Sequence, residues 1–193
     1  MHFGKGNIRY RCITDKQGLD EVDCEKDLGV NVLQDLKASV HCREAYSTAN
    51  RMMGLISRTI KYINTKSLVS LYKSLVRRHL DYCLTVWHPH FSKDKSLLEK
   101  VQHRYTRLFP HLRGLPYKER LHQLGLRSLE ERWNRADLLE IFKMVKGITA
   151  TPWTVFFHRA EDNITRGHSW KLVKNHSQFA TVILDYSSFV SGS

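Results

Sequence analysis

The stretch LYKSLVRRHLDYCLTVWHPH, Leu71 to His90, combines leucine and aromatic side chains with two adjacent arginines and ends in His-Pro-His. Its apolar residues recur at helical spacing, over an arc wide enough for burial against two neighbouring helices. Pro89 ends such a helix, and Thr65 is the expected N-cap at its start. The stretch therefore predicts the centre of a helical bundle, with His79 as a hydrogen-bonded core histidine.

Helical periodicity continues on both sides of this stretch. Upstream it begins near Ser39 and places apolar residues from Cys42 to Ile63 on one face. Downstream, Ser92 is expected to cap a helix over about residues 93–109, and a short helix is expected near residues 117–124. Ser128-Leu129-Glu130-Glu131 is a capping-box pattern, which opens a helix that ends at Gly147. The expected core face of that last helix comprises Leu138, Ile141, Phe142 and Val145.

The N-terminal residues have the pattern of strands instead. Residues 7–13 alternate between polar and apolar, and residues 28–33 are a second candidate strand. The expected fold class is mainly α: a short N-terminal β-hairpin or strand region, then a helical bundle, then an irregular C-terminal tail. The expected parts are residues 1–35, residues 36–148, and residues 149–193 as a poorly structured extension or short strands.

Composition describes an ordinary globular chain. Of 193 residues, 41% are hydrophobic and 26% charged, and no apolar run approaches the roughly 20 residues that span a bilayer. The first residues lack the pattern of a signal peptide. The four cysteines are scattered, which favours reduced core thiols over a zinc ribbon or a disulfide scaffold. We expect an intracellular protein, cytoplasmic or nuclear and not secreted, without a membrane partner.

The net charge of +12 is the strongest global signal, and it is uneven along the chain. Residues 1–40 contain 6 Lys+Arg against 7 Asp+Glu, whereas residues 41–193 contain 25 against 12. A basic block attracts polyanions through counterion release, without any reading of sequence. RNA or DNA is the expected partner, and a generic solubilising surface, an acidic membrane or a protein partner are the alternatives.

The candidate binding residues lie mainly on the helix expected over residues 93–109. Four of its cations fall within about 60° of each other on a helical wheel, where they can follow a phosphate backbone. These cations are Lys93, Lys100, Arg104 and Arg107. Arg51 and Arg58 form a looser second set on the helix that begins near Ser39. A solvated face with extended side-chain stems is the alternative for both sets.

Signs of catalysis are missing from the sequence. Gly4-Lys5-Gly6 lacks the spacing of a phosphate-binding loop, and His88 and His90 lack further metal ligands at matching spacing. Polymerase-type phosphoryl transfer uses carboxylates that hold two divalent cations, commonly with an adjacent Asp-Asp pair, and the chain contains no Asp-Asp. We predict no catalytic residue, no metal site and no small-molecule substrate in this chain.

Six motifs occur in an order that resembles the C-terminal region of a reverse transcriptase from non-LTR retrotransposons, of the LINE type and the jockey and chicken-repeat group. They are DLGV, LYKSLVRRHLDYCLTVWHPH, LLEKVQHRYTR, LRGLPYKERLHQLGLRSLEER, ADLLEIFKMVKG and TRGHSWKL. The resemblance covers about residues 2–173. It departs from the family at Arg78, where a proline is usual, at Ala136, where a glycine is frequent, and beyond Lys174.

The resemblance implies that residues 1–35 are similar to the last palm strands and that the helices are similar to the thumb, which grips template and primer. The magnesium-binding aspartates of the family belong to a palm region that this chain does not match. The resemblance therefore implies a fragment of an RNA-directed DNA polymerase that binds RNA or DNA without sequence preference and is inactive alone. A helical protein-interaction module, a non-functional retrotransposon-derived product and an intact enzyme of another type remain alternatives. The preference for RNA or DNA and the oligomeric state stay open.

Overall fold

The computed structural model describes residues 1–3, 7–8, 10–14, 16–60, 64–159 and 172–174. These residues are mainly helical, with a short strand region near the N-terminus, as the sequence predicts. The chain divides into two units, residues 1–134 and residues 135–193, and each is described by itself. No helix in the described ranges has the length and apolar character needed to cross a bilayer.

Two antiparallel hairpins precede the helices in the first unit. Strand β1 (Ile13–Thr14) pairs with β2 (Gln17–Gly18), and β3 (Cys24–Asp27) pairs with β4 (Val30–Leu33). The expectation of a strand over residues 7–13 is wrong at the described residues 7–8 and 10–12, and only Ile13 lies in a strand. The side chains of these described residues are exposed, so they provide no buried surface that would hold the segment against a neighbour.

The second candidate strand is confirmed only over β4. Leu28 and Gly29 form the two-residue turn between β3 and β4, with φ of 44° and 83°. Two positive φ values are what a tight hairpin turn with the right-handed strand twist requires, and glycine reaches them without steric cost. Leu28 is 81% exposed, because its place in the turn removes it from the sheet face.

Helix α1 (Ser39–Thr59) follows the hairpin and begins where periodicity predicts. Its buried face includes Cys42, Ala45, Ala49, Met53 and Ile56. The hairpin is attached to the first turns of this helix by polar contacts. Glu44 accepts hydrogen bonds from Lys26, at 2.6 Å, and from the Asn31 side chain. The Asn31 amide N–H donates to Nδ1 of His41 at 3.3 Å.

The single helix predicted around the Leu71–His90 stretch is instead four short helical segments. They are α2 (Thr65–Leu71), the π-helical segment η1 (Tyr72–Val76), α3 (Arg78–Asp81) and α4 (Leu84–Trp87). Asn64, rather than Thr65, caps α2: its side chain accepts from the Ser67 N–H at 2.8 Å.

The break between α3 and α4 coincides with tertiary contacts of Tyr82. Cys83 adopts a left-handed conformation with φ of 49°. This turn frees the Tyr82 carbonyl to accept from the Trp87 indole N–H at 2.5 Å, and the Tyr82 hydroxyl donates to the Leu28 carbonyl in the hairpin turn at 2.9 Å. Tyr82 thus connects the helices to the hairpin, which a continuous helix would not allow.

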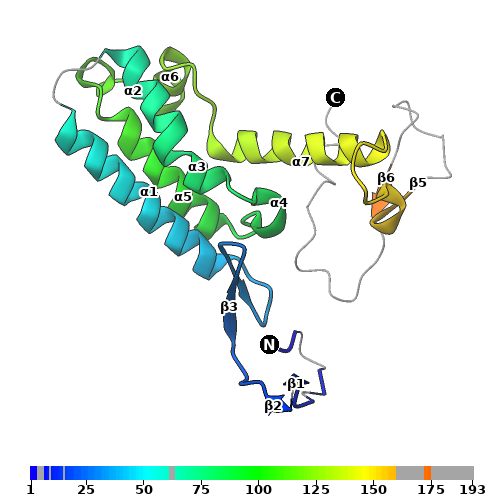
Figure 1. Ribbon diagram of the computed structural model, residues 1–193. Helices are drawn as coiled ribbons and strands as arrows, with labels where there is room; N and C mark the ends of the chain where they lie inside the picture. Colours follow the sequence, from blue (N-terminus) through cyan, green and yellow to red (C-terminus); the bar gives the residue numbers. More distant parts are fainter. Residues whose placement is uncertain (4–6, 9, 15, 61–63, 160–171, 175–193) are drawn as a thin grey trace. The chain divides into compact units, whose positions relative to one another are not determined.

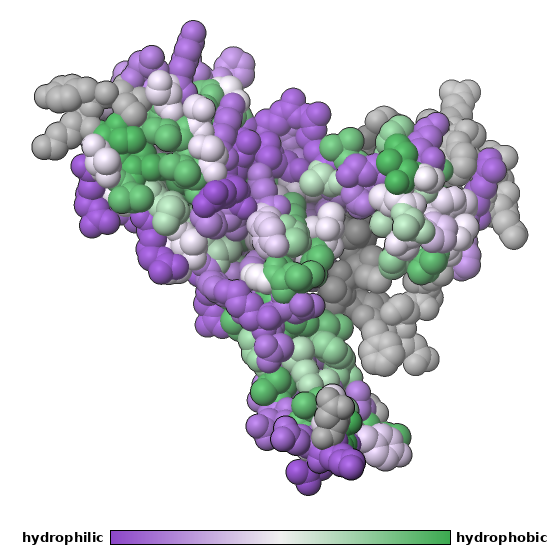
Figure 2. Space-filling view, in the orientation of Figure 1, coloured by the Kyte–Doolittle hydropathy of each residue, from purple (hydrophilic) through white to green (hydrophobic). Residues whose placement is uncertain are grey.

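Helix α5 (Ser92–Thr106) packs along α1, and Figure 1 shows the two side by side. The first unit continues with a 3-10 turn, η2 (Pro110–Leu112), and helix α6 (Tyr117–Gln123), close to the range predicted. Tyr72 of η1 and Tyr105 of α5 stack in the centre, with ring centroids 4.0 Å apart. Figure 2 shows hydrophilic and apolar side chains mixed over this face, with an apolar patch near the C-terminal end of α1.

Helix α7 (Leu129–Val145) crosses from the first unit into the second. Its predicted start is confirmed, because the Ser128 hydroxyl accepts from the Glu131 N–H at 3.2 Å. Gly147 follows its end with φ of 67°, a conformation that suits glycine after a helix. The predicted core face is wrong for Leu138 and Phe142, which are 40% and 53% exposed, while Ile141 and Val145 are half-buried.

The rest of the second unit contains a 3-10 turn, η3 (Trp153–Val155), and one antiparallel pair, β5 (Phe157–Arg159) with β6 (Leu172–Lys174). The predicted tail beyond Lys174 lies outside the described residues. None of the four cysteines forms a disulfide; Cys42 is buried, Cys83 is half-buried, and Cys12 and Cys24 are exposed, so the expectation of core thiols is wrong for the last two.

Candidate nucleic-acid interface

Helix α5 ends at Thr106, three residues before the predicted end, so Lys93, Lys100 and Arg104 lie on α5 and Arg107 is its C-cap residue. All four of these predicted cations are exposed. We call these four residues the α5 ridge. The opposite side of α5 is buried and includes Leu98, Val101 and Tyr105. Lys93 additionally covers a neighbouring ring, because its Nζ lies 5.4 Å from the centroid of Phe91. The helical wheel thus separates the charged and packed sides of α5 correctly.

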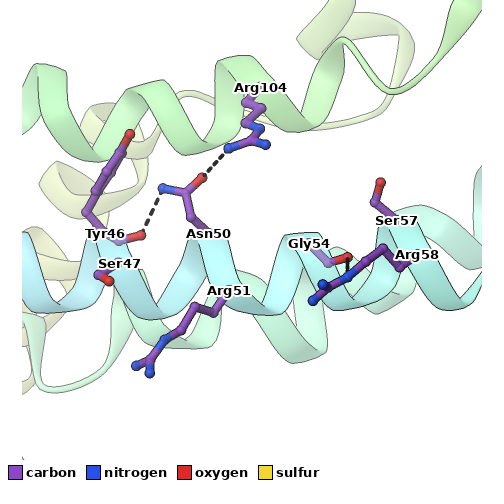
Figure 3. Close-up of a pocket in the computed structure, with 8 residues that line it drawn as sticks. All are labelled: Tyr46, Ser47, Asn50, Arg51, Gly54, Ser57, Arg58 and Arg104. Carbon is purple, nitrogen blue, oxygen red and sulfur yellow. Dashed lines mark hydrogen bonds between the residues drawn. The ribbon is translucent and has the colours of Figure 1, made fainter.

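An open pocket of about 840 Å³ lies between α1 and α5 and brings together three of the six predicted binding residues. We call it the basic pocket, after Arg51, Arg58 and Arg104. Figure 3 shows Arg104 reaching from α5 towards Asn50 of α1. Arg51 and Arg58 extend from α1 itself. The remaining lining residues are Tyr46, Ser47, Asn50, Gly54 and Ser57.

Lys93, Lys100 and Arg107 do not line the basic pocket. They continue the exposed side of α5 in both directions from Arg104, one to three turns towards the N-terminus and one turn towards the C-terminus. The six predicted residues therefore form two partly overlapping sets: a pocket shared by two helices, and a ridge on one helix, with Arg104 in both.

Small side chains on α1 create the space for this pocket. Ser47, Gly54 and Ser57 follow each other along one side of the helix at spacings of seven and three residues. A Cβ placed on Gly54 would meet no atom within 4 Å, so the surface above it is open. The low surface between Arg51 and Arg58 exposes both guanidinium groups to a ligand that lies along the helix.

Among the described residues, the guanidinium groups of the basic pocket hydrogen-bond to neutral acceptors. Arg104 Nη1 lies 3.5 Å from Asn50 Oδ1, Arg51 Nη2 donates to Thr48 Oγ1 at 3.0 Å, and Arg58 Nε donates to the Gly54 carbonyl at 3.2 Å. The ion pairs between described side chains include none of these three arginines. Their positive charge is therefore not neutralised by carboxylates within the described part of the chain.

The pKa values of two nearby histidines are lowered by burial first and by neighbouring cations second. The pKa of His79 is lowered, first by burial and then by the charges of Arg78 and Arg51. The pKa of His103 is likewise lowered, by burial and then by Arg120 and Arg107. His79 is half-buried, and its Nε2 has no hydrogen-bond partner among the described residues. The prediction of a hydrogen-bonded core histidine is wrong at that atom.

A buried polar network holds the other side of α5, and sequence reasoning missed it. Gln102 is fully buried: its Oε1 accepts from the Tyr72 hydroxyl at 2.9 Å, and its Nε2 donates to Tyr117 Oη at 3.1 Å and to the Arg127 carbonyl at 2.8 Å. Glu99 accepts from the Tyr117 hydroxyl and, at 2.9 Å, from the Leu129 N–H. Burial raises the pKa of Glu99, against the opposing effect of these hydrogen bonds.

Buried Asp94 is a second polar residue on the packed side, and its Oδ2 accepts from the Ser39 hydroxyl at 2.6 Å. The only sequence signal for these residues is that a polar side chain falls on the same face of the helix as apolar ones. Gln102, for example, is four residues after Leu98 and one after Val101. That pattern suggests burial with partners but cannot identify them.

The described residues contain no grouping of three or more His, Cys, Asp and Glu that could hold a metal ion. The magnesium that the family resemblance implies has no fitting donor set among them. Comparison of the chain with protein-family models, with curated proteins and with solved structures gives no match. The proposed function therefore rests on the geometry of α1 and α5.

Proposed function

We propose that this chain binds RNA or DNA without sequence preference, with its phosphates held in the basic pocket between α1 and α5. The observation that carries the proposal is the set of Arg51, Arg58 and Arg104 lining one open pocket with no carboxylate paired to them among the described residues. Guanidinium groups form charge-assisted, often bidentate hydrogen bonds to phosphate oxygens, and these contacts carry no sequence information.

The resemblance to the thumb region of non-LTR reverse transcriptases supports the same proposal from a separate direction. A thumb grips template and primer while another part of the polymerase performs the chemistry. We therefore propose a reverse-transcriptase-like fragment that retains the gripping helices and lacks the catalytic aspartate pair. Because no Asp-Asp pair occurs in the chain, we expect no primer extension by this chain alone on an RNA template with magnesium or manganese.

The length of the pocket suits an extended chain of phosphates. Arg51 and Arg58 are seven residues apart on α1, which corresponds to about 10.5 Å along the helix axis. Arg104 approaches from α5 at the level of Asn50 and adds a third positive charge to the pocket lining. The exposed cations of the α5 ridge extend the positive surface beyond the pocket.

The test compares three variants that each remove three positive charges. The pocket variant combines Arg51→Ala, Arg58→Ala and Arg104→Ala. The ridge variant combines Lys93→Ala, Lys100→Ala and Arg107→Ala. The control variant combines Arg43→Ala, Arg113→Ala and Lys118→Ala, three exposed residues that do not line the pocket. Thermal unfolding of each protein first establishes that all three remain folded.

Binding of a labelled single-stranded RNA of mixed sequence is then measured by fluorescence anisotropy between about 50 and 200 mM salt. Three lost phosphate contacts reduce the slope of log K against log salt by about 2 for a single strand. The pocket variant is expected to show that reduction, the ridge variant a smaller one, and the control variant none. Equal slopes for the pocket and control variants would remove the pocket from the binding site.

A helical protein-interaction module is the second candidate, and one observation favours it. Large apolar side chains are exposed on both units, including Leu28 at 81%, Leu139 at 60% and Phe142 at 53%. Contiguous exposed apolar surface is a mark of protein association. RNA binding that does not respond to salt, or to any of the three charge-removing variants, would favour this candidate over the proposed function.

A further inference from the structure

A second pocket, of about 350 Å³, lies between α2, η1 and α6 in the first unit, and Figure 1 shows α2 and α6 close together. We call it the lysine pocket. Lys66 and Lys73 line it together with the side chains of Ser70 and Gln123. Its size falls at the lower end of the range typical of small-ligand pockets, roughly 300–1,000 Å³.

Three polar residues of the lysine pocket lie on one side of the continuous helical segment formed by α2 and η1. Lys66, Ser70 and Lys73 are separated by four and three residues, the spacing that places side chains above each other. Val69 and Leu124 also line the pocket and are buried, at 8% and 6% exposure, so they form an apolar floor beneath the donors. An apolar floor with a few convergent donors is the usual construction of a small-ligand site.

The donors are suited to an anion. Lysine ammonium groups, a serine hydroxyl and a glutamine amide can all donate hydrogen bonds to the same group of oxygens. Neither Lys66 nor Lys73 is part of an ion pair between described side chains. The two charges therefore have no carboxylate partner within the described part of the chain.

A local departure from α-helical geometry supports this assignment independently. Lys73 lies in the π-helical segment η1, where the Arg77 N–H donates to the Tyr72 carbonyl five residues earlier. Single-turn π segments inside α-helices are rare and occur frequently at functional sites, because the extra residue changes the direction of nearby side chains. The Ser74 hydroxyl, which donates to the Ser70 carbonyl at 3.0 Å, satisfies a carbonyl in this region.

The lysines could instead serve only to neutralise the carbonyls at the C-terminal end of α6. Those carbonyls already have backbone partners. The N–H groups of Leu124, Gly125 and Leu126 donate to the carbonyls of Arg120, His122 and Leu121, at 3.2, 3.0 and 2.9 Å. Because the helix end is capped by its own chain, two additional lysines are not needed there.

We propose that the lysine pocket binds a phosphate group. The phosphate belongs either to a free phosphorylated ligand or to the polynucleotide that the proposed function places in the basic pocket. The proposal does not depend on that function, since it rests on different residues. Lys66 and Lys73 hold the phosphate oxygens from two turns of one helix, while Ser70 and Gln123 add neutral donors.

The experiment follows backbone amide chemical shifts in ¹H–¹⁵N NMR spectra during separate titrations with pyrophosphate, AMP, adenosine and single-stranded RNA. It uses the full chain and compares wild type with the double variant Lys66→Ala/Lys73→Ala. A matched double variant, Arg43→Ala/Lys118→Ala, removes the same charge elsewhere. The third comparison is the variant that removes Arg51, Arg58 and Arg104 from the basic pocket, called the pocket variant above.

Saturable shifts at Ser70, Lys73 and Gln123 are expected with a phosphate-bearing titrant and not with adenosine. The double lysine variant should weaken this binding at least tenfold, and the matched double variant should not. Shifts with pyrophosphate or AMP identify a free phosphorylated ligand; shifts with RNA alone identify the polynucleotide. Retention of the pyrophosphate shifts in the pocket variant would show that the two pockets act separately.

The proposal is overturned if no phosphate-bearing titrant shifts these amides, if adenosine shifts them equally, or if the double lysine variant binds as wild type does. Loss of RNA binding in the pocket variant bears only on the proposed function. Because Lys66 and Lys73 are exposed, their replacement is not expected to disturb folding, and the spectrum without ligand verifies this for each variant.

Discussion

Replacing Gln102 by leucine should destabilise the protein strongly, although leucine is apolar, has a similar size and suits a helix. Gln102 is fully buried between η1, α6 and the segment before α7. Its amide makes hydrogen bonds to the Tyr72 hydroxyl, the Tyr117 hydroxyl and the Arg127 carbonyl, at 2.9, 3.1 and 2.8 Å, and a longer one to Glu99 Oε1 at 3.4 Å. Leucine fills the volume but leaves these four partners without the amide.

The size of the effect follows from the cost of orphaned polar groups. Each neutral hydrogen bond contributes about 1 kcal/mol net, and each buried group left unpaired costs about 1–3 kcal/mol. Tyr117 keeps a partner, since its hydroxyl donates to Glu99, whereas the Arg127 carbonyl and the Tyr72 hydroxyl lose the amide. We expect a loss of about 3–5 kcal/mol of unfolding free energy. For a chain of this length, that corresponds to a fall of about 10 °C in Tm.

The assay is urea unfolding followed by circular dichroism, with Gln123→Leu as the matched control. Gln123 is exposed on α6, so its replacement should change the unfolding free energy by less than about 0.5 kcal/mol. A double-mutant cycle with Tyr72→Phe isolates the hydrogen bond between these two side chains. A Gln102→Leu protein within about 1 kcal/mol of wild type, or a cycle with no coupling, would refute the network as a source of stability.

Two further predictions concern the hairpin turn and a buried carboxylate. Leu28→Asn should raise the unfolding free energy by about 0.5–1 kcal/mol, because asparagine tolerates the left-handed conformation better than leucine and Leu28 is exposed. Urea unfolding measures this change, and a variant less stable than wild type would contradict the prediction. The pKa of Glu99 is raised by burial above 4.5, so its contribution to stability is greatest below pH 4.5 and is lost as the pH rises through the folded-state pKa. Wild type should therefore lose stability relative to Glu99→Gln as the pH is raised over that interval in parallel unfolding series, and a relative gain would contradict the assignment.

Local signals in the sequence were sufficient for most helix positions. The start of α1 near Ser39 follows from apolar periodicity, and the start of α7 follows from the capping box at Ser128. The same kind of reasoning failed between Tyr82 and Trp87. At the break there, the Tyr82 hydroxyl donates to the Leu28 carbonyl, 54 residues away. A contact of that kind leaves no trace in helical periodicity.

In the candidate site, too, features of a single helix could be predicted from the sequence, whereas features that depend on the packing of two helices could not. The α5 ridge could be predicted because three of its cations are on one helix and the fourth, Arg107, is the C-cap residue of that helix. The basic pocket requires α1 and α5 to pack with Arg104 beside Asn50, and neither sequence alone indicates that alignment. Gly54 and Ser57 did not indicate a pocket in the sequence, because small residues occur inside helices for many reasons. The contribution of Gly54 is known only from the structure, where an added Cβ would meet no atom within 4 Å.

Helix α5 carries both the structural network and part of the proposed binding surface, and its geometry keeps them apart. Gln102 and Arg104 are two residues apart, which places their side chains about 200° from each other around the helix. Loss of the network at Gln102 should therefore loosen the attachment of α6 and the start of α7, where Tyr117 and the Arg127 carbonyl are bonded, rather than the packing of α5 on α1. Well below its Tm, Gln102→Leu should keep the wild-type salt dependence of RNA binding. A slope reduced as far as that of the pocket variant would mean that the basic pocket depends on the buried network, and the stability and binding roles of α5 could not then be separated.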